Sequence, residues 1–131
     1  ETRGNKDCHV ILRGGKAPNY AKADVDAACA QLKAAGLREQ VMIDCSHANS
    51  SKQHQRQIVV AEDVAAQIAA GEARITGLMI ESHLEEGRQD IVDGQLLKPG
   101  VSVTDACISF AQTQPVLQGL AEAVRARRAK G

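Results

Sequence analysis

The sequence predicts an α/β protein built around a parallel sheet, and three observations lead to this fold class. Short apolar runs alternate with longer segments in which apolar residues recur at helical spacing. The apolar runs begin roughly 30 to 35 residues apart, which is the spacing of strand–helix–strand units. Aromatic residues make up only 2% of the chain. Ala, Val, Ile and Leu must therefore fill the core, as suits the layers of a parallel α/β fold.

The composition is that of an ordinary globular protein. At 131 residues, with 44% hydrophobic and 24% charged residues, the chain can form one domain with a hydrophobic core over residues 1–131. The formal net charge is zero, so neither a nucleic-acid nor a membrane partner is predicted. No signal peptide or long apolar span is present, and no CxxC pair occurs. We therefore expect a cytoplasmic protein with free thiols at Cys8, Cys29, Cys45 and Cys107.

The first strand and helix are expected near the start of the chain. An apolar run predicts a strand over Cys8–Leu12, and Arg13 follows it directly. The next two residues, Gly14-Gly15, permit a tight turn or a close approach of the backbone to a ligand. They form neither a dinucleotide fingerprint nor a P-loop. Helical spacing then predicts a helix over about residues 23–35, which Gly36 ends.

The second unit contains the most distinctive turn of the sequence. A strand is expected over residues 40–45, and His47 lies on the turn that leaves its carboxyl end. Ser50 and Gln53 have the spacing of a capping box. That spacing predicts a helix from about Ser51 to Ala70.

The third unit ends in a long loop. A nearly continuous apolar run predicts a buried strand over residues 75–82, with Glu81 near its exit. The segment 84–103 is irregular and rich in glycine, and long loops of this kind are usually functional. Thr104 is then expected to cap a short helix that has Asp105 in its first turn.

The last predicted element is a helix from about Pro115 to Ala126. The basic residues at 125–130 favour a helix carboxyl terminus and are expected to form a solvated tail. The predicted order is therefore strand, helix, strand, helix, strand, long loop and helices.

Four side chains stand out by their position in this order. Arg13, His47 and Glu81 leave the carboxyl ends of successive strands, and Asp105 follows the long loop. In a barrel or an open parallel sheet they would all point into one rim. His, Glu and Asp together suit a divalent metal such as Mn, Fe, Co or Zn. Arginine suits a phosphate or carboxylate, so the set indicates a reaction on a phosphorylated substrate that bears a carbonyl group.

Each of these residues also has a structural interpretation. His47 could be a hydrogen-bonded turn residue, Asp105 a helix cap and Arg13 a surface side chain. Glu81 ends an apolar strand, where an unpaired buried carboxylate would be costly. Cys45 could add a thiolate ligand beside His47 if the strand stays regular. The remaining histidines are expected to be structural or exposed: His9, His54 and His83.

Four stretches of the sequence carry a resemblance to a known family. The matching stretches are Leu-Arg-Gly-Gly at 12–15, Met-Ile-Asp-Cys-Ser-His-Ala-Asn-Ser at 42–50, Ile-Glu-Ser-His-Leu at 80–84 and Thr-Asp-Ala-Cys at 104–107. Over essentially its whole length, the chain resembles the C-terminal part of the class I 3-deoxy-7-phosphoheptulonate (DAHP) synthases. The resemblance implies the C-terminal portion of a (β/α)8 TIM barrel, with about three βα units.

The resemblance also implies a function and a site. The family condenses phosphoenolpyruvate with erythrose 4-phosphate in a metal-dependent, aldol-type reaction, the first step of the shikimate pathway to the aromatic amino acids. By resemblance His47, Glu81 and Asp105 match three metal ligands, and Arg13 matches an arginine that binds phosphoenolpyruvate. The full-length enzyme is expected to be a transferase and a homo-oligomer.

Parts of the family pattern are missing from this sequence. A fourth ligand, a cysteine, and a Lys-Pro-Arg-Thr stretch that holds erythrose 4-phosphate lie upstream in the family. A full barrel takes about 250 residues. We therefore expect a fragment or a truncated product, with an unpaired edge on its first strand and without normal turnover alone. Two alternatives are an inactive structural or interaction fragment and an unrelated phosphate-binding α/β module, although the latter needs a glycine-rich phosphate loop that is not found.

Overall fold

A parallel sheet lies at the centre of the computed structural model, which describes residues 1–5, 7–95 and 97–131. The strands are β1 (Val10–Leu12), β2 (Val41–Asp44) and β3 (Ile75–Met79). They pair in the order β1-β2-β3, and both pairings are parallel. The predicted parallel α/β arrangement is confirmed, and the strands are shorter at their ends than the apolar runs suggested.

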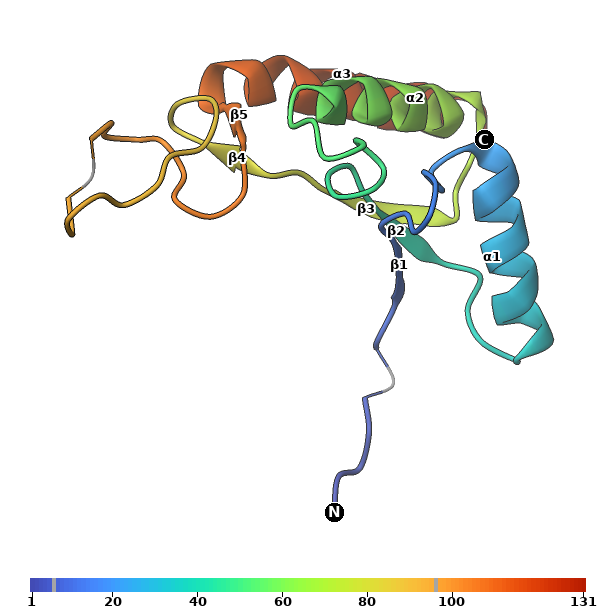
Figure 1. The fold of residues 1–131 in the computed structure, drawn as a ribbon. Coiled ribbons are helices and arrows are strands. Elements are labelled where there is room, and N and C mark those ends of the chain that lie inside the picture. The colour runs from blue at the N-terminus through green and yellow to red at the C-terminus, as the bar shows by residue number, and fades with distance from the viewer. Residues whose placement is uncertain (6, 96) are drawn as a thin grey trace.

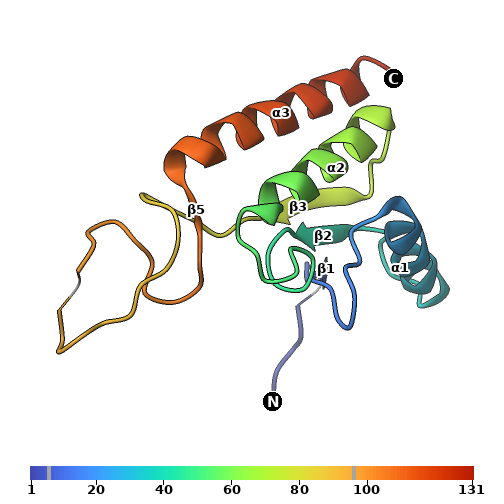
Figure 2. The same cartoon turned by 45° about the horizontal axis from the view of Figure 1, so that its top comes forward.

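Helices follow the three strands and lie on one side of the sheet (Figures 1 and 2). They are α1 (Lys22–Ala34), α2 (Arg56–Ala70) and α3 (Phe110–Arg128). Helices α2 and α3 run side by side, whereas α1 covers the β1–β2 side (Figure 2). Within the described residues, none of the helices is long and apolar enough to cross a membrane.

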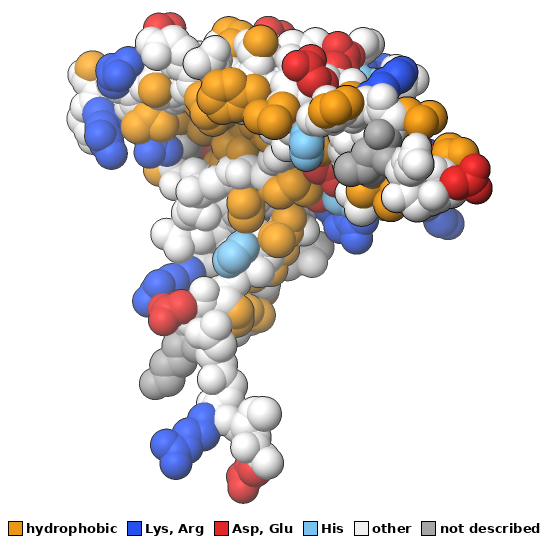
Figure 3. All heavy atoms as spheres, turned by 90° about the vertical axis from the view of Figure 1, so that its left-hand side faces the viewer, with side chains coloured by type: hydrophobic (Ala, Val, Ile, Leu, Met, Phe, Trp, Pro, Cys, Tyr) orange, Lys and Arg blue, Asp and Glu red, His pale blue; other side chains and the backbone are white. Residues whose placement is uncertain are grey.

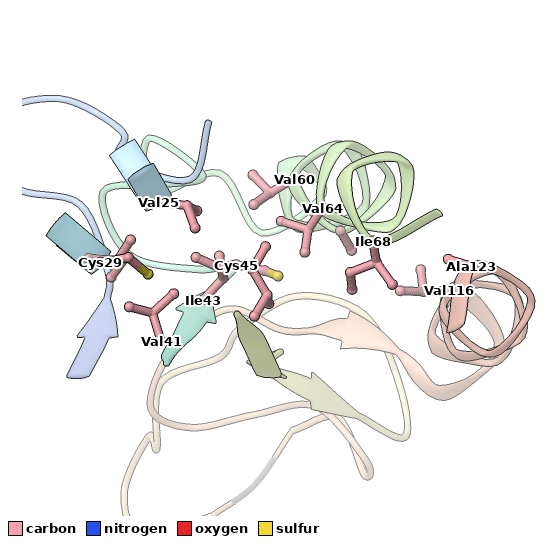
Figure 4. Packing of buried hydrophobic residues seen from close by; sticks show 13 residues of the cluster. Val25, Cys29, Val41, Ile43, Cys45, Val60, Val64, Ile68, Val116 and Ala123 are labelled. Atoms are coloured by element: carbon pink, nitrogen blue, oxygen red, sulfur yellow. The ribbon is translucent and has the colours of Figure 1, made fainter. Parts of the chain in front are cut away.

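The core lies between the sheet and the helices (Figure 4). Alternate residues of β2 and the residue after it, Val41, Ile43 and Cys45, are fully buried on the helix side. These side chains contact aliphatic side chains of α1 and α2. Helix α3 packs beside α2, where Val116 and Ala123 lie next to Ile68 (Figure 4). The scarcity of aromatic residues is therefore matched by a core of small aliphatic side chains.

A second, very small sheet, which was not predicted from the sequence, holds the two ends of the long irregular segment. It consists of β4 (Ser82–His83) and β5 (Ile108–Ser109), paired in parallel. Between them the chain leaves the body of the protein as a wide loop (Figure 1). The base of this loop is closed by Gly87 and Cys107, whose main chains exchange two hydrogen bonds. The loop therefore returns to a fixed position beside the sheet.

The predicted start of the second helix is wrong. Helix α2 begins at Arg56, and the residues before it form turns. Ser51 and Lys52 have φ values of 53° and 58°, in the left-handed region that a right-handed helix cannot include. The Ser50 hydroxyl donates to the carbonyl of His47 instead of capping a helix. A tight turn therefore replaces the expected first helical turn.

Two predictions near the end of the chain are also wrong. Thr104 caps no helix, because residues 103–105 form a bend. Helix α3 begins at Phe110, five residues before Pro115, where Ser109 and Gln112 form a capping box. The basic residues do lie in the last turn of α3 and the end of the chain is mostly exposed, as predicted, while Arg127 and Lys130 also donate to main-chain carbonyls of the segment that ends α2.

Candidate active site

A hollow of about 560 Å³ opens at the carboxyl ends of the three strands. All four residues singled out from the sequence line it, and they come from four separate segments of the chain: Arg13, His47, Glu81 and Asp105. Other lining residues come from the same loops: Gly14, Gly15, Ser46, Ala48, Lys52, His54 and Ala106. Since the carboxyl ends of parallel strands meet at one edge, these segments converge there.

His47 lies on the tight turn after β2, with φ of 49°. Its Nδ1 atom is 2.7 Å from Oδ2 of Asp44, a residue that is only 4% exposed. Its Nε2 atom lies 4.0 Å from Oε1 of Glu81. That separation is too long for a hydrogen bond. The imidazole is therefore anchored on one side and has an unused nitrogen on the side of Glu81.

Glu81 is fixed by both its backbone and its side chain. Gln57 of α2 is fully buried, donates to the carbonyl of Glu81 and accepts from its N–H. The Ser46 hydroxyl donates to Oε2 of Glu81 over 2.6 Å. These contacts leave Oε1 without a side-chain hydrogen-bond partner among the described residues. An unpaired buried carboxylate would be costly at this position. The structure avoids that cost, because Glu81 has these polar contacts.

Arg13 extends from a loop that a buried asparagine ties to the His47 turn. The side chain of Asn49 is fully buried and donates to the carbonyls of Leu12 and Asp44, the last residues of β1 and β2. Its Oδ1 accepts from the N–H of Asn19, and the Asn19 side chain accepts from the N–H of Gly14. Both neighbours of Arg13 are therefore held in place, while its own side chain is exposed.

The structure brings the three predicted metal ligands to one hollow without closing them into one cluster. His47 and Glu81 are neighbours, and Asp105 lines the same hollow from the bend after the long loop. Among the residues that the structure describes, no three His, Cys, Asp or Glu side chains form a group that could hold a metal. An imidazole nitrogen and a carboxylate oxygen on opposite sides of one gap do fit a divalent cation chemically. His47 and Glu81 could therefore hold a divalent cation as a pair, and Asp105 lines the same hollow.

Sequence reasoning missed several residues of the site. His54 lines the hollow and its Nε2 lies 2.9 Å from Glu86, which also accepts from Gln55 and Gln112. These hydrogen bonds hold the pKa of the Glu86 carboxyl below its ordinary value. Lys52 lines the same hollow. The backbone of Lys52 is left-handed, which its residue type does not predict. No signal in the sequence therefore indicated that Lys52 would line the hollow.

The alternative that Cys45 supplies a thiolate ligand is not supported. Cys45 is fully buried on the helix side of β2, and burial together with the neighbouring Asp44 charge raises the pKa of its thiol to about 12. Burial also raises the pKa of the thiols of Cys29 and Cys107. Thiol, not thiolate, is therefore the form of Cys45 at neutral pH.

Thiol labelling tests this placement. At pH 8 in native buffer, iodoacetamide is expected to modify Cys8, which is exposed, and to leave the buried Cys29, Cys45 and Cys107 unmodified. Mass spectrometry of the alkylated chain would give one adduct in native buffer and four in denaturant. Rapid native labelling of Cys45 would contradict the buried position of this residue.

Acidic, imidazole and guanidinium groups lie around one hollow at the carboxyl ends of parallel strands. The chain is therefore an α/β protein with a candidate active site. Known proteins match it closely. The chain is 54% identical over 128 residues to phospho-2-dehydro-3-deoxyheptonate aldolase of Haemophilus influenzae, covering 97% of this chain and 35% of that protein. It is 55% identical over 127 residues to the Phe-sensitive enzyme of that name from Escherichia coli, covering 97% and 36%.

A solved structure agrees with these relatives. The phospho-2-dehydro-3-deoxyheptonate aldolase of Francisella tularensis superimposes with a TM-score of 0.90 at 50% identity, over 96% of this chain and 37% of that one. The model of the DAHP synthetase I family matches residues 1–118. The chain belongs to the DAHP synthetase I family. It spans just over a third of the length of the relatives it matches, 35% and 36% of the two enzymes above.

Proposed function

We propose that this chain carries part of the active site of a DAHP synthase. The reaction is the metal-dependent, aldol-type condensation of phosphoenolpyruvate with erythrose 4-phosphate, which opens the shikimate pathway to the aromatic amino acids. The single observation that carries the proposal is the convergence of Arg13, His47, Glu81 and Asp105 on one hollow at the strand ends. Family membership then supplies the reaction to which such a set of groups belongs.

Arg13 is assigned to phosphoenolpyruvate. Its planar guanidinium can bind a carboxylate or phosphate through two parallel hydrogen bonds. No acidic side chain forms an ion pair with it within the described part of the chain, so its donors remain free for a ligand. The side chains of Asn49 and Asn19 hold the main chain on the two sides of Arg13, at Leu12 and at Gly14. An anionic substrate is thereby oriented towards His47 and Glu81.

His47 and Glu81 are assigned to the metal, with Asp105 as a third ligand. Their free atoms, Nε2 and Oε1, lie 4.0 Å apart across the gap where a cation would be held. When bound, a divalent metal would supply Lewis acidity that polarises the aldehyde of the second substrate. The chain's own contribution is to hold these donors in place and to orient the anionic substrate beside them.

The rest of the proposed fold is a (β/α)8 barrel. In the described residues β1 and β3 form the edges of the sheet. Val10 and Ile11 of β1 are 40% and 47% exposed, which is unusual for apolar residues of a parallel strand. Figure 3 shows further hydrophobic side chains open to the surface. Additional strands on either edge, as in a closed barrel, would cover such side chains and satisfy the open edges.

Metal binding tests the proposal. Calorimetric titration of the chain with Mn(II) is expected to show binding that weakens at least tenfold in His47→Ala and in Glu81→Ala, since each change removes one ligand. His9→Ala is the matched control, because His9 is exposed and does not line the hollow. Equal affinity in the wild type and both ligand variants would contradict the proposed site.

A further inference from the structure

Two buried polar residues are bonded to the candidate ligands: one is the last residue of β2 and the other belongs to the turn that follows it. Asp44 and Ser46 are only 4% and 5% exposed. Buried polar groups of this kind are retained where their hydrogen bonds do something specific, since burying them is costly. Each of these two side chains is bonded to a different candidate ligand.

Asp44 holds the imidazole of His47. Oδ2 of Asp44 is 2.7 Å from Nδ1 of His47, and Oδ1 accepts from the N–H of Ser46 over 2.8 Å. A carboxylate can only accept hydrogen bonds, so in this pair the Nδ1–H group is the donor and Asp44 is the acceptor. The other ring nitrogen, Nε2, is the atom that faces Glu81 and is left for a ligand.

Ser46 holds the carboxylate of Glu81 in a similar way. Its hydroxyl donates to Oε2 over 2.6 Å, a short bond of the charge-assisted kind. That bond fixes the rotation of the carboxylate and leaves Oε1 towards His47 Nε2, 4.0 Å away. One short segment of the chain therefore orients two ligands that follow separate strands, β2 and β3.

We propose that Asp44 and Ser46 are positioning residues that aim Nε2 of His47 and Oε1 of Glu81 at a common divalent cation. The inference rests on the proposed function, because it assumes that His47 and Glu81 are ligands. It adds a supporting layer of hydrogen bonds that fixes the orientation of both donor atoms before the cation arrives. Removing such hydrogen-bonded support typically weakens metal affinity by about 10- to 100-fold.

The alternative is that these hydrogen bonds only stabilise the turn, and the chain offers a matched control for that role. Ser50 is fully buried in the same turn and donates to the carbonyl of His47, without touching a ligand side chain. A change at Ser50 therefore disturbs the turn. It does not remove the hydrogen bonds by which Asp44 and Ser46 orient the two ligand side chains.

The experiment compares Asp44→Asn, Ser46→Ala, Ser46→Thr and Ser50→Ala in the 131-residue chain. Mn(II) affinity is measured by calorimetry, and the visible absorption of bound Co(II) reports ligand geometry. Asp44→Asn and Ser46→Ala are expected to bind Mn(II) about 10- to 100-fold more weakly and to alter the Co(II) spectrum. Ser46→Thr, which keeps the hydroxyl, is expected to restore most of the affinity, and Ser50→Ala to bind as the wild type does while unfolding at a lower temperature.

The outcomes separate this inference from the function on which it rests. If His47→Ala loses affinity while Asp44→Asn and Ser46→Ala bind as the wild type does, the positioning role is overturned and the ligand assignment stands. If Ser50→Ala weakens binding as much as Ser46→Ala, the hydrogen bonds are structural only, and the inference is again overturned. If the wild type binds no Mn(II), both proposals fail. Should Asp44→Asn not fold, the comparison of the three serine variants decides.

Discussion

Replacing Asn49 with alanine is expected to lower the free energy of unfolding by about 3–5 kcal/mol, a large part of the stability of a small domain. The side chain is fully buried and makes three hydrogen bonds to the main chain, at Leu12, Asp44 and Asn19. Alanine would leave two carbonyls and one N–H without these partners. Urea unfolding of the 131-residue chain, followed by circular dichroism, measures the change.

Ser50→Ala is the control for this prediction. Ser50 is the next residue and is equally buried, and its side chain makes a single hydrogen bond, to the carbonyl of His47. Its replacement is expected to cost about 1 kcal/mol. If Asn49→Ala cost no more than Ser50→Ala, the asparagine would not be what joins the ends of β1 and β2.

Four of the side chains that line the hollow were predicted from the sequence, because their positions follow from the order of the elements along the chain. Arg13, His47 and Glu81 each come just after an apolar run, and the carboxyl ends of parallel strands meet at one edge. Asp105 was found in the same way, as the first acidic residue after the long loop, although the helix expected there does not form. The three apolar runs likewise predicted the three strands of the main sheet and their succession along the chain.

The polar support behind these groups could not be predicted, because its contacts join distant residues. Asn49 and Leu12 are 37 residues apart, Ser46 and Glu81 are 35 apart, and no periodicity of the sequence relates them. Buried Asp44 and Gln57 likewise resemble ordinary polar residues until their partners are known. Only the folded chain shows which carboxylate or carbonyl each of them meets.

Two local signals in the sequence were misleading about where helices begin. Ser50 and Gln53 have capping-box spacing, yet the Ser50 hydroxyl bonds the His47 carbonyl and the next two residues are left-handed. Pro115 suggested a helix start, but the cap at Ser109 and Gln112 begins the helix earlier. In the first case a left-handed turn takes the place of the expected cap, and in the second a capping box nearer the start of the chain begins the helix before the proline.

Replacing Gly14 with alanine is expected to destabilise the chain by about 2–5 kcal/mol, because two separate costs add. Gly14 has φ of +78°, in the left-handed region that costs an L-residue about 1–2 kcal/mol. A Cβ there would also lie 2.7 Å from Cβ of Ala48 and 2.9 Å from the backbone nitrogen of Asn49. Backbone atoms cannot yield as a flexible side chain can, so the Arg13 loop must move away from the His47 turn.

Two other glycines separate these costs. Gly36 has φ of +69° and open space around it, so Gly36→Ala is expected to show the conformational cost alone. Gly15 has neither the left-handed φ nor a close neighbour, and Gly15→Ala should be nearly neutral. Urea unfolding of the three variants should therefore rank Gly14→Ala as most costly, then Gly36→Ala, then Gly15→Ala. Equal costs at Gly14 and Gly36 would mean that the two loops do not approach each other as closely as the hollow requires, and the placement of Arg13 beside His47 would fail with it.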